Sequence, residues 1–226
     1  AGSTRATVVF FTNFGVAYSC RLIDIPATTG YGEPIQRLFK LKDGERVIAA
    51  ISLDPRATPN ITGTTRRPEP PTHAIAVTTD GYSLRFSFEP FIEPSTRAGR
   101  RYARPAVDSE VVGVTAISGK ETLIAATREA RAVLCEAREV NFLSGPGKGV
   151  MLIKIKKGAD RVIGFVASSS DRDLLTVETN RGATQTISTA KYEVVGRGGK
   201  GRELLKRGQF NQILPRPVEV PLLEET

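Results

Sequence analysis

The sequence has only two cysteines and one histidine, and this shortage excludes several kinds of site. Cys20 and Cys135 lie among apolar residues, so we expect reduced, buried thiols and no disulfide framework. A structural zinc site needs four ligands in paired spacings, which these residues do not supply. A nucleophile activated by histidine is equally unsupported. We therefore expect no catalytic residues, no metal and no cofactor in this chain, and do not expect an enzyme.

Long apolar runs are also missing. No stretch reaches the roughly 18 apolar residues of a membrane span, and the start of the chain lacks a charged, then apolar leader. We therefore predict a cytoplasmic protein without a membrane partner. The first residue is Ala1 and not Met, which suggests a piece cut from a longer chain.

Acidic residues are fewer than basic ones. The 226 residues carry a formal net charge of +8 and have a pI of about 9.7, which favours a polyanionic partner such as nucleic acid. The excess is concentrated: Gly145–Gln209 holds 13 basic and 6 acidic residues, and Ser95–Arg104 holds four arginines and no acid. Hydrophobic residues make up 40%, enough for a sizeable core.

Four segments of the chain read alike. Each has an apolar run, then T-x-x-G or T-x-x-A, then alternating residues; they are Val8–Ile25, Ala74–Phe91, Thr122–Glu139 and Leu174–Lys191. The turn positions are Gly15, Gly81, Ala130 and Gly182, so successive turns are 66, 49 and 52 residues apart.

Two further landmarks keep the same spacing. A glycine in a Gly-rich loop, basic in the last three copies, follows each turn after 17, 18, 17 and 17 residues, at Gly32, Gly99, Gly147 and Gly199. An apolar strand follows after 32, 30, 32 and 31 residues, at Val47, Val111, Val162 and Ile213. Repeats of 40–50 residues with four strands each indicate a propeller-like array.

We therefore predict one all-β domain of about four blades, each of roughly 50 residues and four strands. The approximate repeats are 5–55, 72–118, 119–170 and 171–221, with a Pro- and Thr-rich linker at 56–71. One alternative competes in the third repeat, because Thr122–Val140 also has the apolar spacing of an amphipathic helix. The register of the copies favours a hairpin centred on Arg128–Ala130 instead.

These residues resemble the C-terminal domain of the A subunit of bacterial type IIA topoisomerases, DNA gyrase and topoisomerase IV. The resemblance rests on FFTNFGVAY, VETNRGATQTI, the Gly-Lys loops at Gly145–Gly149 and Gly196–Gly201, and the 50-residue period, and it covers about Thr7 to Val220. It implies a β-pinwheel, a propeller-like disc whose blades exchange strands, with a rim that binds, bends and wraps duplex DNA. The parent enzyme would be ATP-dependent and would include a B subunit.

Gyrase carries a box, QRRGGKG, in its first blade. Here Arg197–Gly201 reads RGGKG and lies in the last repeat, preceded by Val195 and Gly196. This departure, the small number of repeats and an ending similar to that of topoisomerase IV A subunits favour topoisomerase IV over gyrase.

Basic side chains on repeating loops suit phosphate contacts, and glycines let the backbone approach closely. We predict little sequence preference, since no recognition helix is evident. The predicted DNA-binding residues are Arg37, Lys40, Lys42, Arg97, Arg100, Arg101, Arg104, Lys148, Lys154, Lys156, Lys157, Arg181, Arg197, Gly198, Gly199, Lys200, Gly201, Arg202, Lys206 and Arg207. The alternatives are a propeller that binds protein and an RNA-binding β-repeat protein.

Overall fold

The computed structural model describes residues 2–63, 69–156 and 158–215, and its regular structure is β. Within these ranges the only helical segments are one-turn 3-10 helices, namely η1 Leu22–Asp24, η2 Ile35–Arg37, η3 Glu89–Phe91 and η4 Ala137–Glu139. The all-β pinwheel expected from the sequence is therefore confirmed. Part of the predicted linker, residues 64–68, lies outside the described residues.

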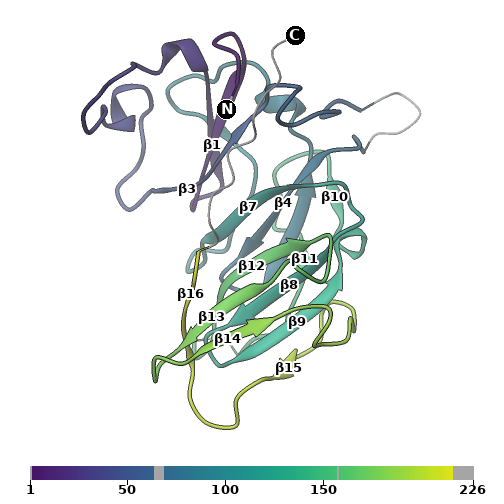
Figure 1. Cartoon of the computed structure of the whole chain (residues 1–226). Coiled ribbons are helices and arrows are strands. Elements are labelled where there is room, and N and C mark those ends of the chain that lie inside the picture. Colours follow the sequence, from purple (N-terminus) through teal and green to yellow (C-terminus); the bar gives the residue numbers. More distant parts are fainter. Residues whose placement is uncertain (1, 64–68, 157, 216–226) are drawn as a thin grey trace.

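Four sheets follow one another along the molecule, from the N-terminal sheet at the top of Figure 1 to the C-terminal sheet at the bottom. The first, in the order β3-β1-β2-β6, consists of β1 Thr7–Thr12, β2 Val16–Arg21, β3 Val47–Ser52 and β6 Arg100–Arg101. The second, in the order β10-β5-β4-β7 with β11 also paired to β5, consists of β4 His73–Thr78, β5 Tyr82–Phe86, β7 Val111–Ile117, β10 Phe142–Leu143 and β11 Val150–Met151.

The third sheet, in the order β12-β8-β9-β15, consists of β8 Thr122–Thr127, β9 Arg131–Glu136, β12 Val162–Ser168 and β15 Arg202–Glu203. The fourth, in the order β14-β13-β16, consists of β13 Leu175–Thr179, β14 Thr184–Ile187 and β16 Phe210–Ile213. The sheets thus differ from four strands each: the second has five, and the fourth has three among the described residues.

Exchange of a strand between repeats explains this difference. The second repeat contributes β6 to the first sheet, the third contributes β10 and β11 to the second sheet, and the fourth contributes β15 to the third sheet. No described segment pairs with the outer edge of β14, so the fourth sheet keeps three strands. The boundaries of the repeats in sequence stay a prediction.

The same backbone joint recurs where each exchanged strand ends. Tyr102 donates its N–H to the Gly15 carbonyl at 2.8 Å, and Leu152 donates to the Gly81 carbonyl at 2.8 Å. In the third sheet Leu204 donates to the carbonyl of Ala130, again at 2.8 Å. The turn of one repeat therefore anchors the loop of the next.

The turns themselves are alike. Gly15, Gly81, Ala130 and Gly182 have φ of 76°, 82°, 55° and 79°. Each donates its N–H to the carbonyl of the threonine three residues earlier, at 3.0–3.1 Å. Ala130 therefore adopts the turn conformation of the glycines, and the hairpin β8-β9 confirms the register over the helical spacing.

Burial on both faces of a sheet explains why the third repeat has helix-like spacing. Leu123 and Ala125 of β8 face the core shared with the second sheet, whereas Ile124 and Ala126 face the core shared with the fourth. Such a strand is a continuous apolar run without alternation, so periodicity alone does not separate it from a buried helix.

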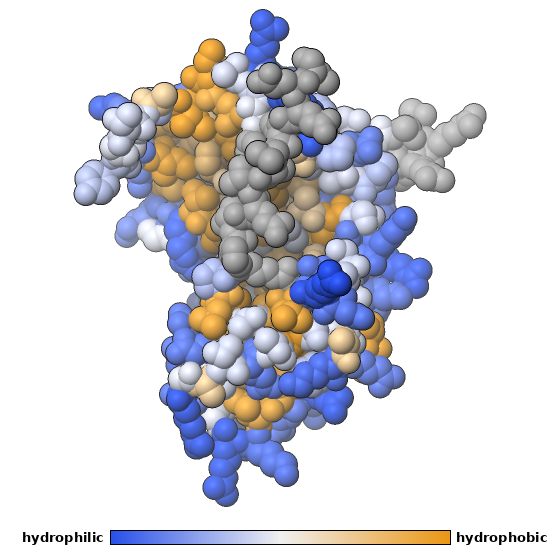
Figure 2. Space-filling view, in the orientation of Figure 1, coloured by the Kyte–Doolittle hydropathy of each residue, from blue (hydrophilic) through white to orange (hydrophobic). Residues whose placement is uncertain are grey.

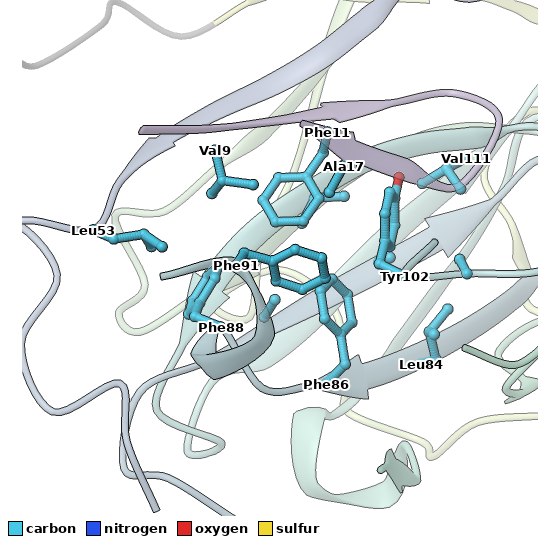
Figure 3. Packing of buried hydrophobic residues seen from close by; sticks show 14 of the residues in the cluster. Val9, Phe11, Ala17, Leu53, Leu84, Phe86, Phe88, Phe91, Tyr102 and Val111 are labelled. Atoms are coloured by element: carbon cyan, nitrogen blue, oxygen red, sulfur yellow. The ribbon is translucent and has the colours of Figure 1, made fainter. Parts of the chain in front are cut away.

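An aromatic cluster joins the first two sheets (Figure 3). The Phe11 ring lies edge-on to Phe86, Phe91 and Tyr102, with centroids 5.8, 5.7 and 5.0 Å apart. The Tyr102 hydroxyl donates to the carbonyl of Thr12 at 2.7 Å. Phe11 and Phe86 are therefore core residues.

Candidate nucleic-acid interface

One basic residue recurs at the same place in all four repeats. Lys154 lies two residues after the joint at Leu152, and its N–H donates to the carbonyl of Gly199 in the next loop at 2.7 Å. Arg104 makes the equivalent bond to the carbonyl of Gly147 at 2.8 Å. These bonds bring the basic end of one loop against the Gly-Lys sequence of the next.

The pattern extends to both ends of the array. Lys40 donates its N–H to the carbonyl of Arg97 at 2.7 Å, and Lys206 lies two residues after the joint at Leu204. All four side chains, those of Lys40, Arg104, Lys154 and Lys206, are exposed. The repeat therefore produces a series of cations, one at each blade, which we call the register cations.

Five predicted residues gather in one open groove of about 960 Å³ between the third and fourth repeats. They are Lys154, Lys156, Lys200, Lys206 and Arg207. Figure 2 shows hydrophilic side chains projecting from the lower end of the molecule, where Figure 1 places the β13-β14 turn and the β15-β16 connection. We call this the C-terminal groove.

The acidic residues that line the C-terminal groove are already engaged. Glu129 accepts a hydrogen bond from the Gln209 amide at 2.6 Å. Asp160 accepts the N–H groups of Glu129 and Arg161 at 3.0 and 2.8 Å. Glu203 pairs with Arg131 at 3.5 Å.

Several predicted residues hold loops together instead of projecting freely. Arg197 donates to the carbonyls of Glu139 and Met151 at 2.8 and 3.2 Å. Arg100 donates to the carbonyl of Pro90. Arg97 donates to the carbonyls of Gln36 and Arg37 at 3.3 and 3.4 Å. The Arg37 side chain pairs with Glu33. Arg101 donates to the carbonyl of Phe14 at 3.5 Å.

Two others lie over tyrosine rings. The Lys148 ammonium is 3.8 Å from the centre of the Tyr82 ring and 3.6 Å from a carboxylate oxygen of Asp80. The Arg202 guanidinium is 5.5 Å from the centre of the Tyr192 ring. Their charge is partly used within the protein.

The glycine box at 197–201 is a folded loop. The Gly198 N–H donates to the carbonyl of Leu152 at 2.7 Å, so this donor is used within the protein. Gly199 supplies the carbonyl bound by Lys154, and Gly201 has a φ of 69° at the start of the exchanged strand. Of the glycines that the spacing singled out, Gly32 and Gly99 have a positive φ, whereas in the third and fourth repeats Gly149 and Gly201, two residues later, have one.

The remaining predicted residues are exposed or lie outside the described residues. Lys42 and Arg181 are exposed, and Lys157 is outside the described residues. Sequence reasoning missed the amides of Asn180 and Gln209, which also line the C-terminal groove. The T-N-x-G sequence shared by the first and fourth turns could have indicated Asn180, because the asparagine is at the same place in both turns. Asn180 accepts the Gln209 N–H at 3.3 Å, as Asn13 accepts the Arg46 N–H at 2.8 Å.

The first loop is the exception among the four. Its Phe39 folds back onto its own sheet, with the ring centroid 5.0 Å from that of Tyr18. The Tyr18 hydroxyl contacts the Glu45 carboxylate at 3.2 Å. Burial, followed by this carboxylate, raises the pKa of Tyr18 to about 12, so the phenol stays protonated.

In the described part of the chain, neither a metal site nor a membrane-spanning helix accompanies this surface. No group of three or more His, Cys, Asp or Glu is placed to bind a metal among the described residues. No helix there is long and apolar enough to span a membrane.

Comparison with known proteins agrees with the repeats and the fold. The family model described as DNA gyrase C-terminal domain, beta-propeller, matches residues 6–54 and 121–169. These ranges hold β1, β2 and β3 of the first sheet and β8, β9 and β12 of the third, together with the exchanged strands β10 and β11. Two of the four repeats are therefore similar to DNA gyrase C-terminal domains. The DNA gyrase A subunit of Buchnera aphidicola is 23% identical over 221 residues, which cover 96% of the chain and 24% of that protein.

Two solved structures have the same fold. The C-terminal domain of DNA topoisomerase IV superposes with a TM-score of 0.78 at 18% identity, covering 93% of this chain and 64% of that one. The DNA gyrase A C-terminal domain gives 0.67 at 19%, covering 94% and 66%. The chain spans about a quarter of the length of the gyrase A subunits it matches.

Proposed function

We propose that this chain is a non-catalytic module that binds and bends duplex DNA for a bacterial type II topoisomerase. It would act in the cytoplasm, joined to the rest of the A subunit, and would work with the B subunit that supplies the ATPase. By bending one DNA segment it would control which segment, or which DNA topology, is acted on.

The observation that carries this proposal is the series of register cations. Lys40, Arg104, Lys154 and Lys206 occur once per blade, and all four are exposed. Duplex DNA has about one phosphate charge per 1.7 Å of its axis, so an evenly repeated cation suits its backbone without reading bases. Bending 20–30 bp costs about 1–6 kcal/mol, which several such contacts must exceed.

The proposed role is closer to topoisomerase IV than to gyrase. The box-like RGGKG lies in the fourth repeat, where Arg197 is bound to carbonyls of the third. The first loop has no basic residue between Ile25 and Arg37. We therefore expect bending without strong chiral wrapping.

Titration onto linear duplexes of about 40 and about 150 bp, at low and high salt, tests the function. We expect tighter binding to the longer duplex and an affinity that falls steeply with salt, because each phosphate contact releases counterions. Duplex RNA of 40 bp serves as the competitor. Absence of duplex DNA binding at low salt would contradict the proposal and favour a protein-binding propeller, and preference for RNA would favour an RNA-binding protein.

Ligation of nicked circular DNA in the presence of the chain tests the second part. A module that bends DNA without chiral wrapping leaves no net writhe in the ligated circles. Positive writhe would assign it a gyrase-like wrapping role instead.

A further inference from the structure

We propose that the C-terminal groove is the anchor that holds the phosphodiester backbone of the duplex, and that the other blades bend DNA already held there. This inference rests on the proposed function. It adds that one end of the molecule holds the DNA while the rest bends it. The sequence predicted cations distributed over all the loops, whereas the structure concentrates the uncommitted ones between the third and fourth repeats.

Unpaired charge distinguishes the groove. Lys154, Lys156, Lys200, Lys206 and Arg207 line it, and none of their side chains has an ion pair or hydrogen bond to a described residue. The acids of the groove are bound by Gln209, by backbone N–H groups and by Arg131. Five unpaired cations therefore line the groove beside three carboxylates, of which that of Glu203 is already paired with Arg131.

The joint between the second and third repeats has less free charge. Arg104 is exposed there without an ion pair to a described residue, but its neighbour Lys148 lies against Asp80 and the Tyr82 ring.

At the joint between the first and second repeats, Lys40 and Lys42 are exposed. Arg97 is bonded to backbone carbonyls, and Arg37 is paired with Glu33. A phosphate at either of these joints would meet fewer uncommitted donors than in the groove.

The groove is also held in shape before any ligand arrives. The backbone bond from Lys154 to Gly199 fixes the third loop against the fourth. Arg131 donates to the carbonyl of Gly201 at 3.4 Å, which fixes the strand that precedes Lys206. A preformed site loses less conformational entropy on binding, so its contacts add more to affinity than those of mobile side chains.

The chemistry of the groove fits a phosphodiester more than a base edge. Four of its five unpaired cations are lysines, which are compact charges with three rotatable donors and no fixed fork. The amides of Asn180 and Gln209 line the same groove. Since no helix or ribbon projects from it within the described residues, we expect binding without sequence preference.

A duplex of about 15 bp tests the anchor because it is far shorter than the persistence length of DNA, about 150 bp, and stays nearly straight. In the groove variant Lys154→Gln, Lys200→Gln, Lys206→Gln, we expect at least a tenfold loss of affinity, and a salt slope reduced by about 2–3. The matched control, Arg5→Gln, Lys120→Gln, Arg172→Gln, removes three exposed charges elsewhere. We expect it to stay within about twofold of the wild type.

A second triple, Lys40→Gln, Lys42→Gln, Arg104→Gln, separates anchoring from bending. It should weaken binding to 150 bp much more than binding to 15 bp. Equal losses on 15 bp for this triple and the groove triple would overturn the anchor while leaving the proposed function intact. Failure of the wild type to bind any duplex would instead refute the proposed function itself.

A tethered cleavage reagent locates the DNA directly. Ala159 lines the groove and is exposed, and Ala27 is an exposed residue of the first loop, so Ala159→Cys and Ala27→Cys can each carry an iron chelate. The native Cys20 and Cys135 are buried, and burial raises the pKa of Cys135 to about 12, which keeps them unreactive. On 15 bp we expect cleavage from position 159 alone. Cleavage from position 27 alone would place the anchor at the other end.

Discussion

A single buried histidine joins the linker to the second and third blades. The Nδ1 of His73 lies 3.0 Å from the carbonyl of Pro70, and its Nε2 lies 3.1 Å from Arg85. Arg85 donates to the carbonyl of Val140 at 2.6 Å and pairs with Glu69 at 3.0 Å. Since Arg85 is always a donor, Nε2 must accept and the imidazole must be neutral.

This arrangement makes the fold sensitive to mild acid. Burial lowers the pKa of His73 in the folded chain, with a smaller lowering contribution from Arg85, while the unfolded residue titrates near its ordinary value of 6.5. The unfolded state therefore binds more protons below about pH 6.5, and stability falls as the pH decreases, by at most about 1.4 kcal/mol per pH unit.

Urea unfolding at pH 7.5 and pH 5.5 measures this loss of stability. The free energy of unfolding should be lower at pH 5.5 for the wild type and change much less for His73→Gln, which has no titrating ring. Equal pH dependence of the two proteins would show that other groups titrate in this range.

Among the secondary-structure elements, the joint between a turn and the next exchanged strand links the blades. Gly81 and Gly182 have nearly the same φ, 82° and 79°, at the same register. A Cβ at Gly81 would lie 2.4 Å from the carbonyl oxygen of Ile153, whereas a Cβ at Gly182 would have no atom within 4 Å. The same substitution therefore tests backbone strain with and without the joint.

We expect Gly182→Ala to cost about 1–2 kcal/mol, the strain of a positive φ. Gly81→Ala should cost at least about 2 kcal/mol more, because the clash also separates the third repeat's strand from the second sheet. Chemical denaturation of both variants measures the difference. Equal costs would mean that the joint contributes little to stability.

The elements predictable from sequence were those with local patterns. Apolar runs and the turns at Gly15, Gly81, Ala130 and Gly182 predicted the hairpins. Each turn is recognisable within one short segment, because the residue with positive φ bonds to the threonine three residues before it. The exchanged strands have two residues each and no apolar pattern, so their partners are set by tertiary contacts.

Similarly, charge composition predicted a basic surface but not which cations are free. The side chains of Arg197 and Arg100 hold loops together because each donates a hydrogen bond to a nearby backbone carbonyl. Lys154 and Lys206 stay exposed in otherwise similar sequences. That distinction depends on how two loops pack, which neither loop determines alone.

For the whole molecule, the net charge of +8 makes both DNA binding and the stability of the fold depend on the salt concentration. Excess positive charge repels itself in the folded state, and about 0.1 M salt screens exposed charges beyond about 10 Å. Among the described residues, five of the eight ion pairs join two side chains that are each at least a third exposed, and such pairs contribute little. Relief of repulsion should therefore outweigh the loss of these pairs.

We expect added salt to weaken DNA binding while raising the unfolding temperature, by about 2–4 °C for each kcal/mol of repulsion relieved. Thermal scans and DNA titrations of one protein sample across the same NaCl series measure both quantities. The Arg5→Gln, Lys120→Gln, Arg172→Gln variant should show a smaller rise in unfolding temperature, because it has fewer charges to screen. If the unfolding temperature instead fell in parallel with affinity, loss of structure and not loss of phosphate contacts would explain the salt dependence of binding.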